Sequence, residues 1–392
     1  MLIKRNAVNL PYEHTISLIM NFKVSSTALY SRLAAASKVM VSKNSMPILD
    51  CFLLEIKDNK ITITASDSEK YFTTYVPTIE QNGEAVFCIP SKTMMESIKE
   101  LAEQPLDITF NESTSEVTGV HSCGTFSVMA QDAAPYPMGQ PLSDEASTIH
   151  LKSETLLNGI NRCLFATAND EIRLVMNGVY VDIKPDMLIF AGTDGRKLVK
   201  NTVHTVQSGF DAGVILSKKV CNILKSVLDK NVEEITLSFD ADKAEVTSPD
   251  MKMSFRLIEG KYPNYNAVIP SDNPYKAVVD RFSLMGALKR VSVFCNQSSG
   301  MVKLELGNNS MKLTGQDYEY STSAEENLMC SYDGPHVCIG FSAQFMLEMA
   351  SILEGESVQL ELADPSRPGV MRPAEEDADD EVLMLIMPMR VE

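Results

Sequence analysis

Ile61-Thr-Ile-Thr-Ala-Ser-Asp67, Met187-Leu-Ile-Phe-Ala-Gly-Thr-Asp194 and Met311-Lys-Leu-Thr-Gly-Gln-Asp317 are three versions of one stretch, about 125 residues apart. Each version is a run of apolar and small residues that ends on Asp, which is typical of a strand entering a turn. Similarity at one fixed spacing is the signature of a chain built from repeats. The sequence therefore predicts one structural unit written three times.

The remaining elements of each unit keep the same offsets. An amphipathic helix follows a polar residue at Ser25, Ser153 and Ser283. Short turns between alternating apolar runs follow at 58–60, 184–186 and 307–309. A second helix, capped by Ser91, Ser217 or Ser342, has matching core positions at Ile98, Leu224 and Met349. The predicted fold class is α+β, with two helices packed on antiparallel sheets in each repeat; three unrelated domains that share turn chemistry are the weaker alternative.

The repeat sets the expected domain boundaries at 20–146, 147–273 and 274–392. Residues 1–19 fit no part of the repeat, and 11–14 interrupt the apolar stretch that a signal peptide needs. We expect them to be a disordered extension, or to lie upstream of a true start at Met20. A chain of 392 residues is long enough for three domains with their own cores.

Composition excludes several classes of protein. No apolar run is long enough to span a bilayer, so no membrane partner is expected. The eight Cys lie singly in apolar patterns without metal spacing, which indicates reduced core residues of a cytoplasmic protein with no metal and no cofactor. The acidic run at 375–381 is better explained as a solvated loop than as a metal site.

The net charge of −17, from 35 basic and 52 acidic residues, argues against a conventional nucleic-acid-binding surface. Basic residues nevertheless recur on matching helices: Lys92 and Lys99 lie seven apart in the first unit, and Lys218 and Lys225 repeat this in the second. Taken singly they indicate solvated helix faces. Their recurrence favours a common basic surface.

No motif for a nucleophile, a phosphate loop or a zinc protease occurs in the chain. The best candidate for acid–base chemistry is Asp194, beside Arg196 and Lys197. Because Asp67 and Asp317 hold the same slot with different neighbours, the shared Asp is better explained as a turn former.

Three further motifs connect the chain to a known family. Gly-Thr-Asp-Gly-Arg-Lys-Leu at 192–198, Gly-Lys-Tyr-Pro-Asn-Tyr at 260–265 and Leu-Ile-Met-Pro-Met-Arg at 385–390 closely resemble the bacterial sliding clamp, the beta subunit of the replicative DNA polymerase III holoenzyme, as does Pro-Ile-Leu at 47–49. The resemblance runs from Met20 to Glu392. It implies clamp domains, a ring-forming head-to-tail homodimer with helices lining the hole, and a processivity factor without catalytic activity or cofactor.

The resemblance also implies the partners. They are a second copy of the chain, double-stranded DNA held without sequence preference, and the replicative polymerase catalytic subunit, the clamp loader, other polymerases and mismatch-repair proteins, which bind through short Leu/Phe motifs. A ring holds DNA topologically, so weak phosphate contacts from its inner helices permit sliding.

The family's DNA-facing positions fall on Lys43, Lys92, Lys99, Lys218 and Lys219, and the repeat adds Arg162 and Arg290. The chain departs from relatives at 169–175, which lacks their polar-aromatic character, and at 296–300, which carries no cation. The family's dimer contact implies Val293 and Phe294 on one subunit, against Phe126 and Val128 on the other.

The family's partner-binding pocket lies between the second and third units. The matching positions are Arg173, Met176, Thr193, Gly195, Arg196, Lys197, Leu198, Pro263, Val268, Leu385, Met387, Pro388, Met389 and Arg390. Three Met give an adaptable apolar surface that suits several partners, although each Met taken alone is more often a core residue.

Two other hypotheses stay open at this level. One is a degenerate enzyme that uses Asp194, Arg196 and Lys197 on an anionic substrate. The other is a clamp-like paralogue that binds partners without encircling DNA.

Overall fold

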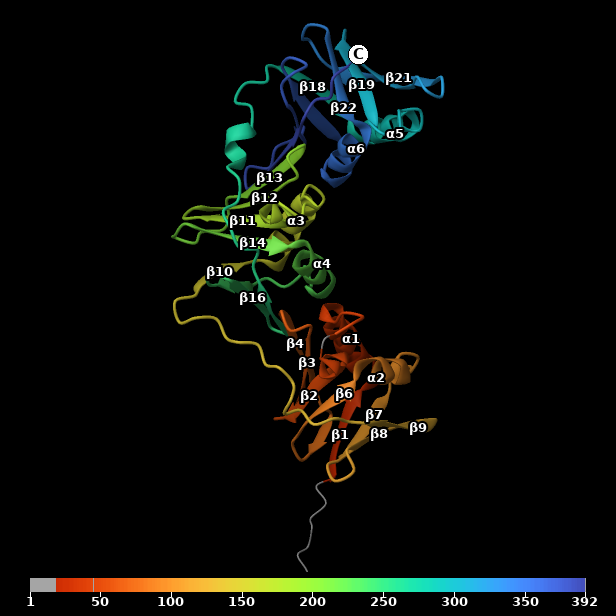
Figure 1. The fold of residues 1–392 in the computed structure, drawn as a ribbon, viewed down its shortest axis with the longest axis vertical. Coiled ribbons are helices and arrows are strands. Elements are labelled where there is room, and N and C mark those ends of the chain that lie inside the picture. Colours follow the sequence, from red (N-terminus) through yellow and green to blue (C-terminus); the bar gives the residue numbers. More distant parts are fainter. Residues whose placement is uncertain (1–18, 45, 392) are drawn as a thin grey trace, which may run out of the picture. The chain divides into compact units, whose positions relative to one another are not determined.

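The computed structural model describes residues 19–44 and 46–391 and separates into two compact units (Figure 1). Unit 1 contains the chain up to Gln140 together with Asp250–Met253, and unit 2 contains Pro141–Pro249 with Ser254–Glu392. Unit 1 therefore holds the first repeat, and unit 2 holds the second and third. Residues 1–18 of the expected extension lie outside the described residues. Its last residue, Ile19, begins the first strand.

Unit 1 contains two sets of hydrogen-bonded strands, ordered β5-β1-β7-β8-β9 and β4-β3-β2-β6. Its helices are α1 (Ser26–Ala36) and α2 (Ser91–Ile98), with 3-10 turns η1 (Ser37–Val39) and η2 (Pro47–Asp50). Its strands are β1 (Ile19–Ser25), β2 (Cys51–Lys57), β3 (Lys60–Ser66), β4 (Lys70–Pro77), β5 (Glu80–Asn82), β6 (Ala85–Pro90), β7 (Pro105–Asn111), β8 (Glu116–His121) and β9 (Gly124–Met129).

The second repeat has the same order of elements. Its helices are α3 (Ser153–Leu164) and α4 (Lys218–Val227), with η3 (Leu174–Met176) and η4 (Tyr265–Val268). Its strands are β10 (Ser147–Leu151), β11 (Gly178–Lys184), β12 (Met187–Thr193), β13 (Lys197–Val203), β14 (Ala212–Ser217), β15 (Ile235–Phe239), β16 (Lys243–Ser248) and β17 (Met251–Arg256).

The third repeat completes unit 2. Its helices are α5 (Arg281–Ser292) and α6 (Ala343–Ile352). Its strands are β18 (Tyr275–Asp280), β19 (Met301–Gly307), β20 (Ser310–Asp317), β21 (Thr322–Ser331), β22 (Val337–Ser342), β23 (Ser357–Leu362), β24 (Gly369–Pro373) and β25 (Asp380–Ile386).

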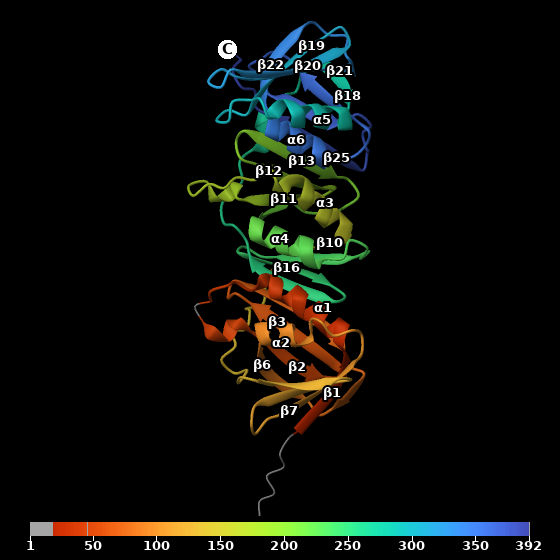
Figure 2. The ribbon, with the colours of Figure 1, turned by 90° about the vertical axis from the view of Figure 1, so that its right-hand side faces the viewer.

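One 12-stranded sheet runs through the second and third repeats, in the order β14-β11-β12-β13-β25-β24-β23-β18-β21-β20-β19-β22. The antiparallel pair β13–β25 is the join between the repeats. Figure 2 shows the four helices of unit 2 on one side of its strands. Within this unit α3 packs on α4, and α5 packs on α6.

The three similar stretches form β3, β12 and β20, each the middle strand of an antiparallel meander. The position two residues before the shared Asp is buried and small: Ala65, Gly192 or Gly315. A Cβ on Gly192 would overlap the carbonyl oxygen of Cys163 in α3, and one on Gly315 would come within 2.5 Å of that of Val291 in α5. The three stretches share a small residue here because the first helix of each repeat packs against this strand.

The shared Asp forms the turn that follows the strand. One carboxylate oxygen of Asp67 accepts from the N–H groups of Glu69 and Lys70, and that of Asp317 does the same for Glu319 and Tyr320. These are Asx turns, as predicted. The tight hairpins at 58–59 and 308–309 have positive φ at both central residues, which is the geometry that the Asp and Asn there favour.

The helices bury the faces that their periodicity predicts: Leu29, Leu33, Leu156, Ile160, Leu284, Leu288, Ile98, Leu224 and Met349 are all buried. Ser25, Ser217 and Ser342 cap their helices as expected. The side chain of each accepts a hydrogen bond from the backbone N–H of the residue three positions later. Three expected starts are wrong. Ser91 and Ser153 are first residues of their helices, and α5 begins two residues before Ser283, capped by Asp280.

The eight Cys are free thiols. Six are buried as expected, while Cys338 is half-buried and Cys123 is exposed, so the prediction of a core position is wrong for Cys123. Across residues 19–44 and 46–391, none of the helices has both the length and the apolar character that crossing a membrane requires.

Candidate functional site

The candidate site lies where β13 meets β25 in unit 2. Leu198 pairs with Leu385 and Lys197 with Ile386, and beyond the last pair the N–H of Met387 donates to the carbonyl of Arg196 at 2.9 Å. Leu198 and Leu385 are buried in a cluster that includes Tyr262 and Tyr265. The chain therefore leaves the sheet beside the loop at 193–197.

Asp194 organises this loop. Its Oδ1 accepts from the N–H groups of Arg196 and Lys197 at 2.8 and 2.9 Å, and its Oδ2 lies 3.0 Å from the ammonium of Lys197. Thr193 donates its hydroxyl to the carbonyl of Lys197 and accepts from the N–H of Gly195, whose φ of +86° suits glycine. Both oxygens of Asp194 are therefore engaged within the loop, Oδ1 by its backbone and Oδ2 by the Lys197 side chain, which is the role of a turn former.

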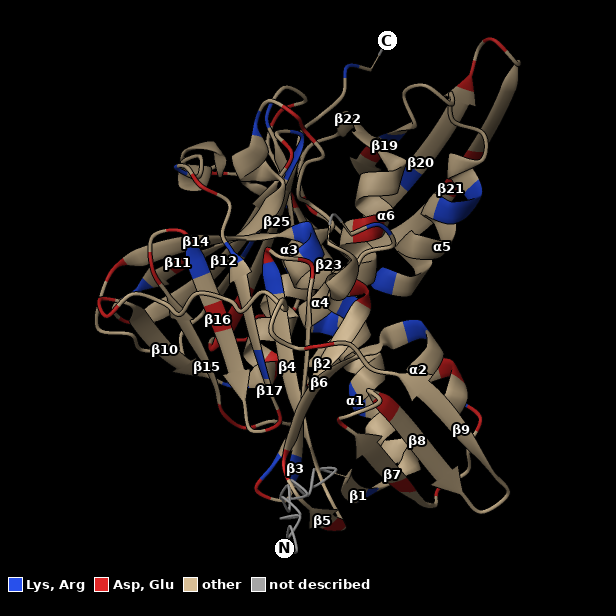
Figure 3. Ribbon diagram, turned by 60° about the horizontal axis from the view of Figure 1, so that its bottom comes forward, with Lys and Arg blue, Asp and Glu red and all other residues tan. Residues whose placement is uncertain are grey.

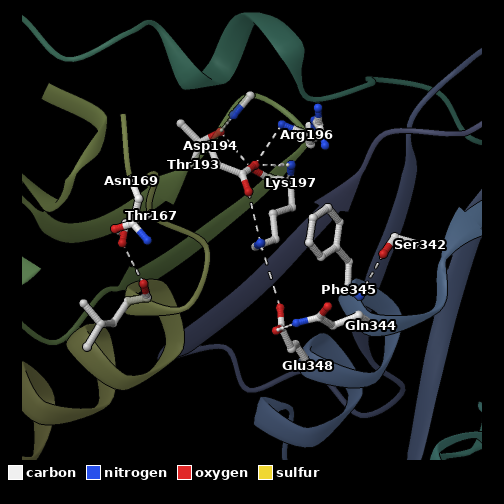
Figure 4. A network of polar contacts seen from close by, with 12 residues as sticks. Thr167, Asn169, Thr193, Asp194, Arg196, Lys197, Ser342, Gln344, Phe345 and Glu348 are labelled. Atoms are coloured by element: carbon white, nitrogen blue, oxygen red, sulfur yellow. Dashed lines mark hydrogen bonds and ion pairs between the residues drawn. The ribbon is translucent and has the colours of Figure 1, made fainter. Parts of the chain in front are cut away.

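Lys197 ties the loop to the third repeat (Figure 4). Its side chain is buried, its ammonium lies 3.7 Å from the centroid of the Phe345 ring, and Glu348 is 3.9 Å away. Phe345 and Glu348 are three residues apart and so lie on one face of α6. The cation–π contact and the two carboxylates compensate the buried charge. Sequence reasoning missed Phe345 and Glu348, because their spacing alone indicates only an ordinary helix face.

Arg173 and Met176 flank the loop from the other side. The guanidinium of Arg173 binds the carboxylate of Asp170 with two nitrogens at 2.8 Å. That carboxylate also accepts from the N–H groups of Arg173 and Ile172, and these bonds lower the pKa of Asp170 to about 2. A Cβ on Gly195 would lie 3.5 Å from Arg173 Nη1 and 3.9 Å from Met176 Cε. The glycine thus keeps the space between the loop and these side chains open.

An exposed apolar rim surrounds the buried floor. Val268, Met387, Leu174 and Ile172 are exposed, and so is Pro263. Below them Tyr180 stacks on Tyr262 with centroids 4.6 Å apart, and the hydroxyl of Tyr265 donates to Asp182 at 2.7 Å. We use the name strand-end groove for one set of residues of the expected pocket that lie at or near this strand end: Arg173, Met176, Gly195, Leu198, Val268, Leu385 and Met387. The set combines buried and exposed apolar side chains.

The last residues of the expected pocket lie elsewhere in unit 2. Met389 donates its N–H to the carbonyl of Gly340 on β22 at 2.8 Å. Met389 is half-buried, and with the exposed Arg390 it lines a separate hollow beside Met301. Pro388, also half-buried, connects the two places.

The basic residues expected to face DNA differ in exposure and in their contacts; Figure 3 shows where Lys and Arg lie along the ribbon. Lys43, Lys92, Lys99 and Lys219 are exposed. Lys218 is half-buried and donates to Asn169 at 2.8 Å and to the carbonyl of Thr167, and burial lowers its pKa. Arg290 is exposed but holds Glu326 through two hydrogen bonds of 2.7 Å.

The expectation for Arg162 is wrong. Only 9% of this residue is exposed, and its guanidinium lies 2.5 Å from Asp380 and 3.5 Å from Glu354. It also donates to Asn201. These contacts join α3 to β25, so Arg162 is part of the structure that unites the second and third repeats.

The residues expected at the dimer contact differ in exposure. Val293 is 77% exposed and Phe294 39% exposed at the end of α5. Phe126 is half-buried, with its ring over Gly119 on the neighbouring strand. Val128 is only 6% exposed and belongs to the core of unit 1, so little of its side chain is available for a contact with a second copy. In the part of the chain that the structure describes, no cluster of His, Cys, Asp or Glu could hold a metal ion.

Replacing Asp194 by Ala should disorder the loop, because two N–H groups lose their acceptor and buried Lys197 loses its nearest carboxylate. We expect a cost of about 1–3 kcal/mol in local stability. Hydrogen exchange should become faster at the amides of Arg196 and Lys197. Asp67→Ala removes the same turn in unit 1 and is the matched control, since it should leave those two amides unchanged. Unaltered exchange in Asp194→Ala would contradict this account of the loop.

The comparisons with known proteins agree along the chain. Family models of the N-terminal, central and C-terminal domains of the DNA polymerase III beta subunit match residues 20–140, 150–264 and 266–390. The beta sliding clamp of Haemophilus influenzae is 27% identical over 376 residues, which cover 95% of this chain and 100% of that protein.

Solved structures show the same fold. The DNA polymerase III beta subunit of Thermotoga maritima has a TM-score of 0.85 at 25% identity, and a sliding clamp of Pseudomonas aeruginosa bound to griselimycin has a TM-score of 0.89 at 22% identity. Each match covers 95% of this chain and 100% of the other. The three repeats are clamp domains, and the chain belongs to the DNA polymerase III beta subunit family, the bacterial sliding clamps.

Proposed function

We propose that two copies of this chain form a head-to-tail ring that encircles duplex DNA and confers processivity on a replicative polymerase, without catalytic activity of its own. The observation that carries the proposal is the location of exposed lysines on helices of a chain whose net charge is −17. An acidic surface elsewhere repels DNA, while exposed lysines neutralise phosphates without reading bases. The DNA-facing set is Lys43, Lys92, Lys99 and Lys219, which are exposed. Lys218 is half-buried and Arg290 holds Glu326 through two hydrogen bonds, so we expect both to contribute less.

The domain boundaries of the sequence prediction, 20–146, 147–273 and 274–392, are part of this proposal, as is a cytoplasmic location. The proposed partners are a second copy of the chain, duplex DNA of any sequence, and polymerases, the clamp loader and mismatch-repair proteins.

Retention on circular DNA tests encirclement. Protein loaded by a clamp loader onto a nicked plasmid circle should resist a salt wash and leave once the circle is linearised, because free ends release a ring. Equal retention on linear DNA would overturn the ring. Loss from both circular and linear DNA, with normal partner binding, would favour the paralogue that binds partners without encircling DNA. The double variant Lys92→Glu and Lys219→Glu should load poorly, whereas Lys57→Glu and Lys276→Glu, the same charge change on exposed strand positions, should load normally.

Two free sheet edges support the position of the subunit contact. β9 is the last strand of the β5-β1-β7-β8-β9 order, and β18 pairs with β21 only at Cys330 and Ser331. The rest of β21 thus has a free edge among the described residues. Exposed edges are templates for pairing with another chain. We propose that β9 of one subunit meets β21 of the next, with Phe126 against Val293 and Phe294.

Phe294→Asp should convert the dimer to a monomer, since it places a charge where apolar area is buried on association. Sedimentation velocity gives the mass, which for the dimer is twice the 43.3 kDa of the chain. Phe282→Asp is the matched control, because Phe282 is also an exposed phenylalanine, 61% exposed against 39% for Phe294, and lies at the opposite end of α5. A Phe294→Asp protein that sediments as an unchanged dimer would show that the interface lies elsewhere.

We further propose that the strand-end groove binds partner peptides. A Leu/Phe side chain would enter between Met176, Leu198, Val268 and Leu385, while Met387 covers it and Arg173 meets polar groups at the rim. Thr193, Arg196 and Lys197 shape the loop, Pro263 borders the groove, and Pro388 leads the chain away from it to Met389 and Arg390. That a Pseudomonas aeruginosa clamp is bound to griselimycin supports a ligand site in a protein of this fold.

Deleting residues 387–392 should abolish binding of a Gln-Leu-x-Leu-Phe-type peptide while leaving the dimer intact. Met387→Asp should weaken that binding by about tenfold or more, since burying a Met side chain contributes about 1.5–3 kcal/mol. Fluorescence polarisation with a labelled peptide measures both. Met138→Asp, at an exposed Met of unit 1, should bind like the unaltered protein. If the truncated protein retains full affinity, the tail is only a structural edge and the partner site lies elsewhere.

A further inference from the structure

A second hollow lies on the third repeat, outside the strand-end groove. Its volume is about 430 Å³, and we call it the tail hollow. β19 and β20 form its base: Lys303 is directly opposite Thr314 in their ladder, and both line it. The alternate residues Val302 and Leu304 are buried on the other face. The hollow thus uses the sheet face that α5 and α6 do not cover.

The residues after Pro388 form one wall. Met389, Arg390 and Val391 line the hollow, and the bond from Met389 to the carbonyl of Gly340 fixes them against β22. A Cβ on Gly340 would come within 2.8 Å of Met301 Sδ and 2.9 Å of the Met389 carbonyl. Glycine at this position therefore allows the tail to lie flat on the sheet. Tyr318, 74% exposed on the β20–β21 hairpin, contributes the opposite wall.

Thr314 gives the hollow a polar anchor. Only 8% of Thr314 is exposed, and its hydroxyl has no hydrogen-bond partner among residues 19–44 and 46–391. A buried hydroxyl without a partner is destabilising, so a native one requires an explanation. A hydroxyl both donates and accepts, which matches the N–H and C=O groups of a peptide backbone.

The charges around the hollow nearly balance, which suits a neutral peptide. Lys303 is 3.4 Å from Glu305, which offsets its charge, and Arg390 and Glu319, of opposite sign, both line the hollow. Gln316 adds an amide, and Met301 and Met389 add adaptable apolar contact. This mixture suits an extended segment with apolar side chains.

The tail hollow is within reach of the strand-end groove. Met387 is bonded at the groove and Met389 in the hollow, and two residues of extended chain span about 7 Å. We propose that the tail hollow binds the residues that flank the Leu/Phe motif of a partner, in extended form, with a backbone group bonded to Thr314. This inference rests on the proposed function of the groove, and it gives partners a second point of contact.

The test compares three peptides by fluorescence polarisation: the short motif, and the motif extended by six residues at either its N- or C-terminal end. One extended peptide should bind about tenfold more tightly than the short one. Thr314→Val, which keeps the shape and removes the hydroxyl, and Tyr318→Ala should each remove most of that gain while leaving the short peptide unchanged. Tyr320→Ala, at an equally exposed tyrosine that does not line the hollow, should preserve the gain.

The outcomes separate the two proposals. If the short peptide binds but neither extension adds affinity, or if the gain survives both Thr314→Val and Tyr318→Ala, the tail hollow is not a partner site and the groove stands. If the short peptide does not bind the unaltered protein, the groove proposal fails and this inference fails with it. Thermal melting of each variant, followed by circular dichroism, tests whether a loss of the extra affinity is due to unfolding of the variant.

Discussion

The ladder between β13 and β25 is the contact on which unit 2 depends. It pairs 197–203 with 380–386, strands from different repeats, so that their backbone groups are satisfied across the join. The same register places Leu198 against Leu385 and brings the chain out beside the loop at 193–197. A shift of one residue would turn the leucine of the shifted strand to the other face. The floor of the groove and the position of Met387 therefore follow from one strand pairing.

Side chains reinforce this join near both ends of the ladder, at Asp380 and at Lys197. Arg162 connects α3 to Asp380, and Lys197 connects the loop to Phe345 and Glu348 on α6. In each case the cation is buried, which makes it costly to leave without its partners. Such a join suits the proposed partner site, whose residues come from different repeats, because partner side chains would then meet a surface that is already formed.

The fold could be predicted because its determinants are local and repeated three times. Asp67, Asp194 and Asp317 form turns with their own next neighbours, and the small residues before them are required by a helix of the same repeat. Periodicity also identified the buried helix faces. What sequence could not provide is the partner of a charged group far along the chain. Arg162 holds the same repeat position as Arg290, but Asp380, 218 residues away, determines that it is buried. The register of the repeat also did not predict that Val128 is buried in unit 1.

The arginines and lysines that were expected to face DNA make different contacts, and the difference follows from the chemistry of their side chains. Arg162 and Arg290, the two that the repeat suggested for DNA, instead hold carboxylates, which a planar guanidinium binds well. The exposed helix positions Lys92, Lys99 and Lys219 carry a compact, strongly hydrated charge on a flexible stem. Such a charge attracts phosphate without fixing its geometry. For a ring that holds DNA by topology, contacts of this kind are an advantage, because a tightly docked phosphate would have to be released at every step along the duplex.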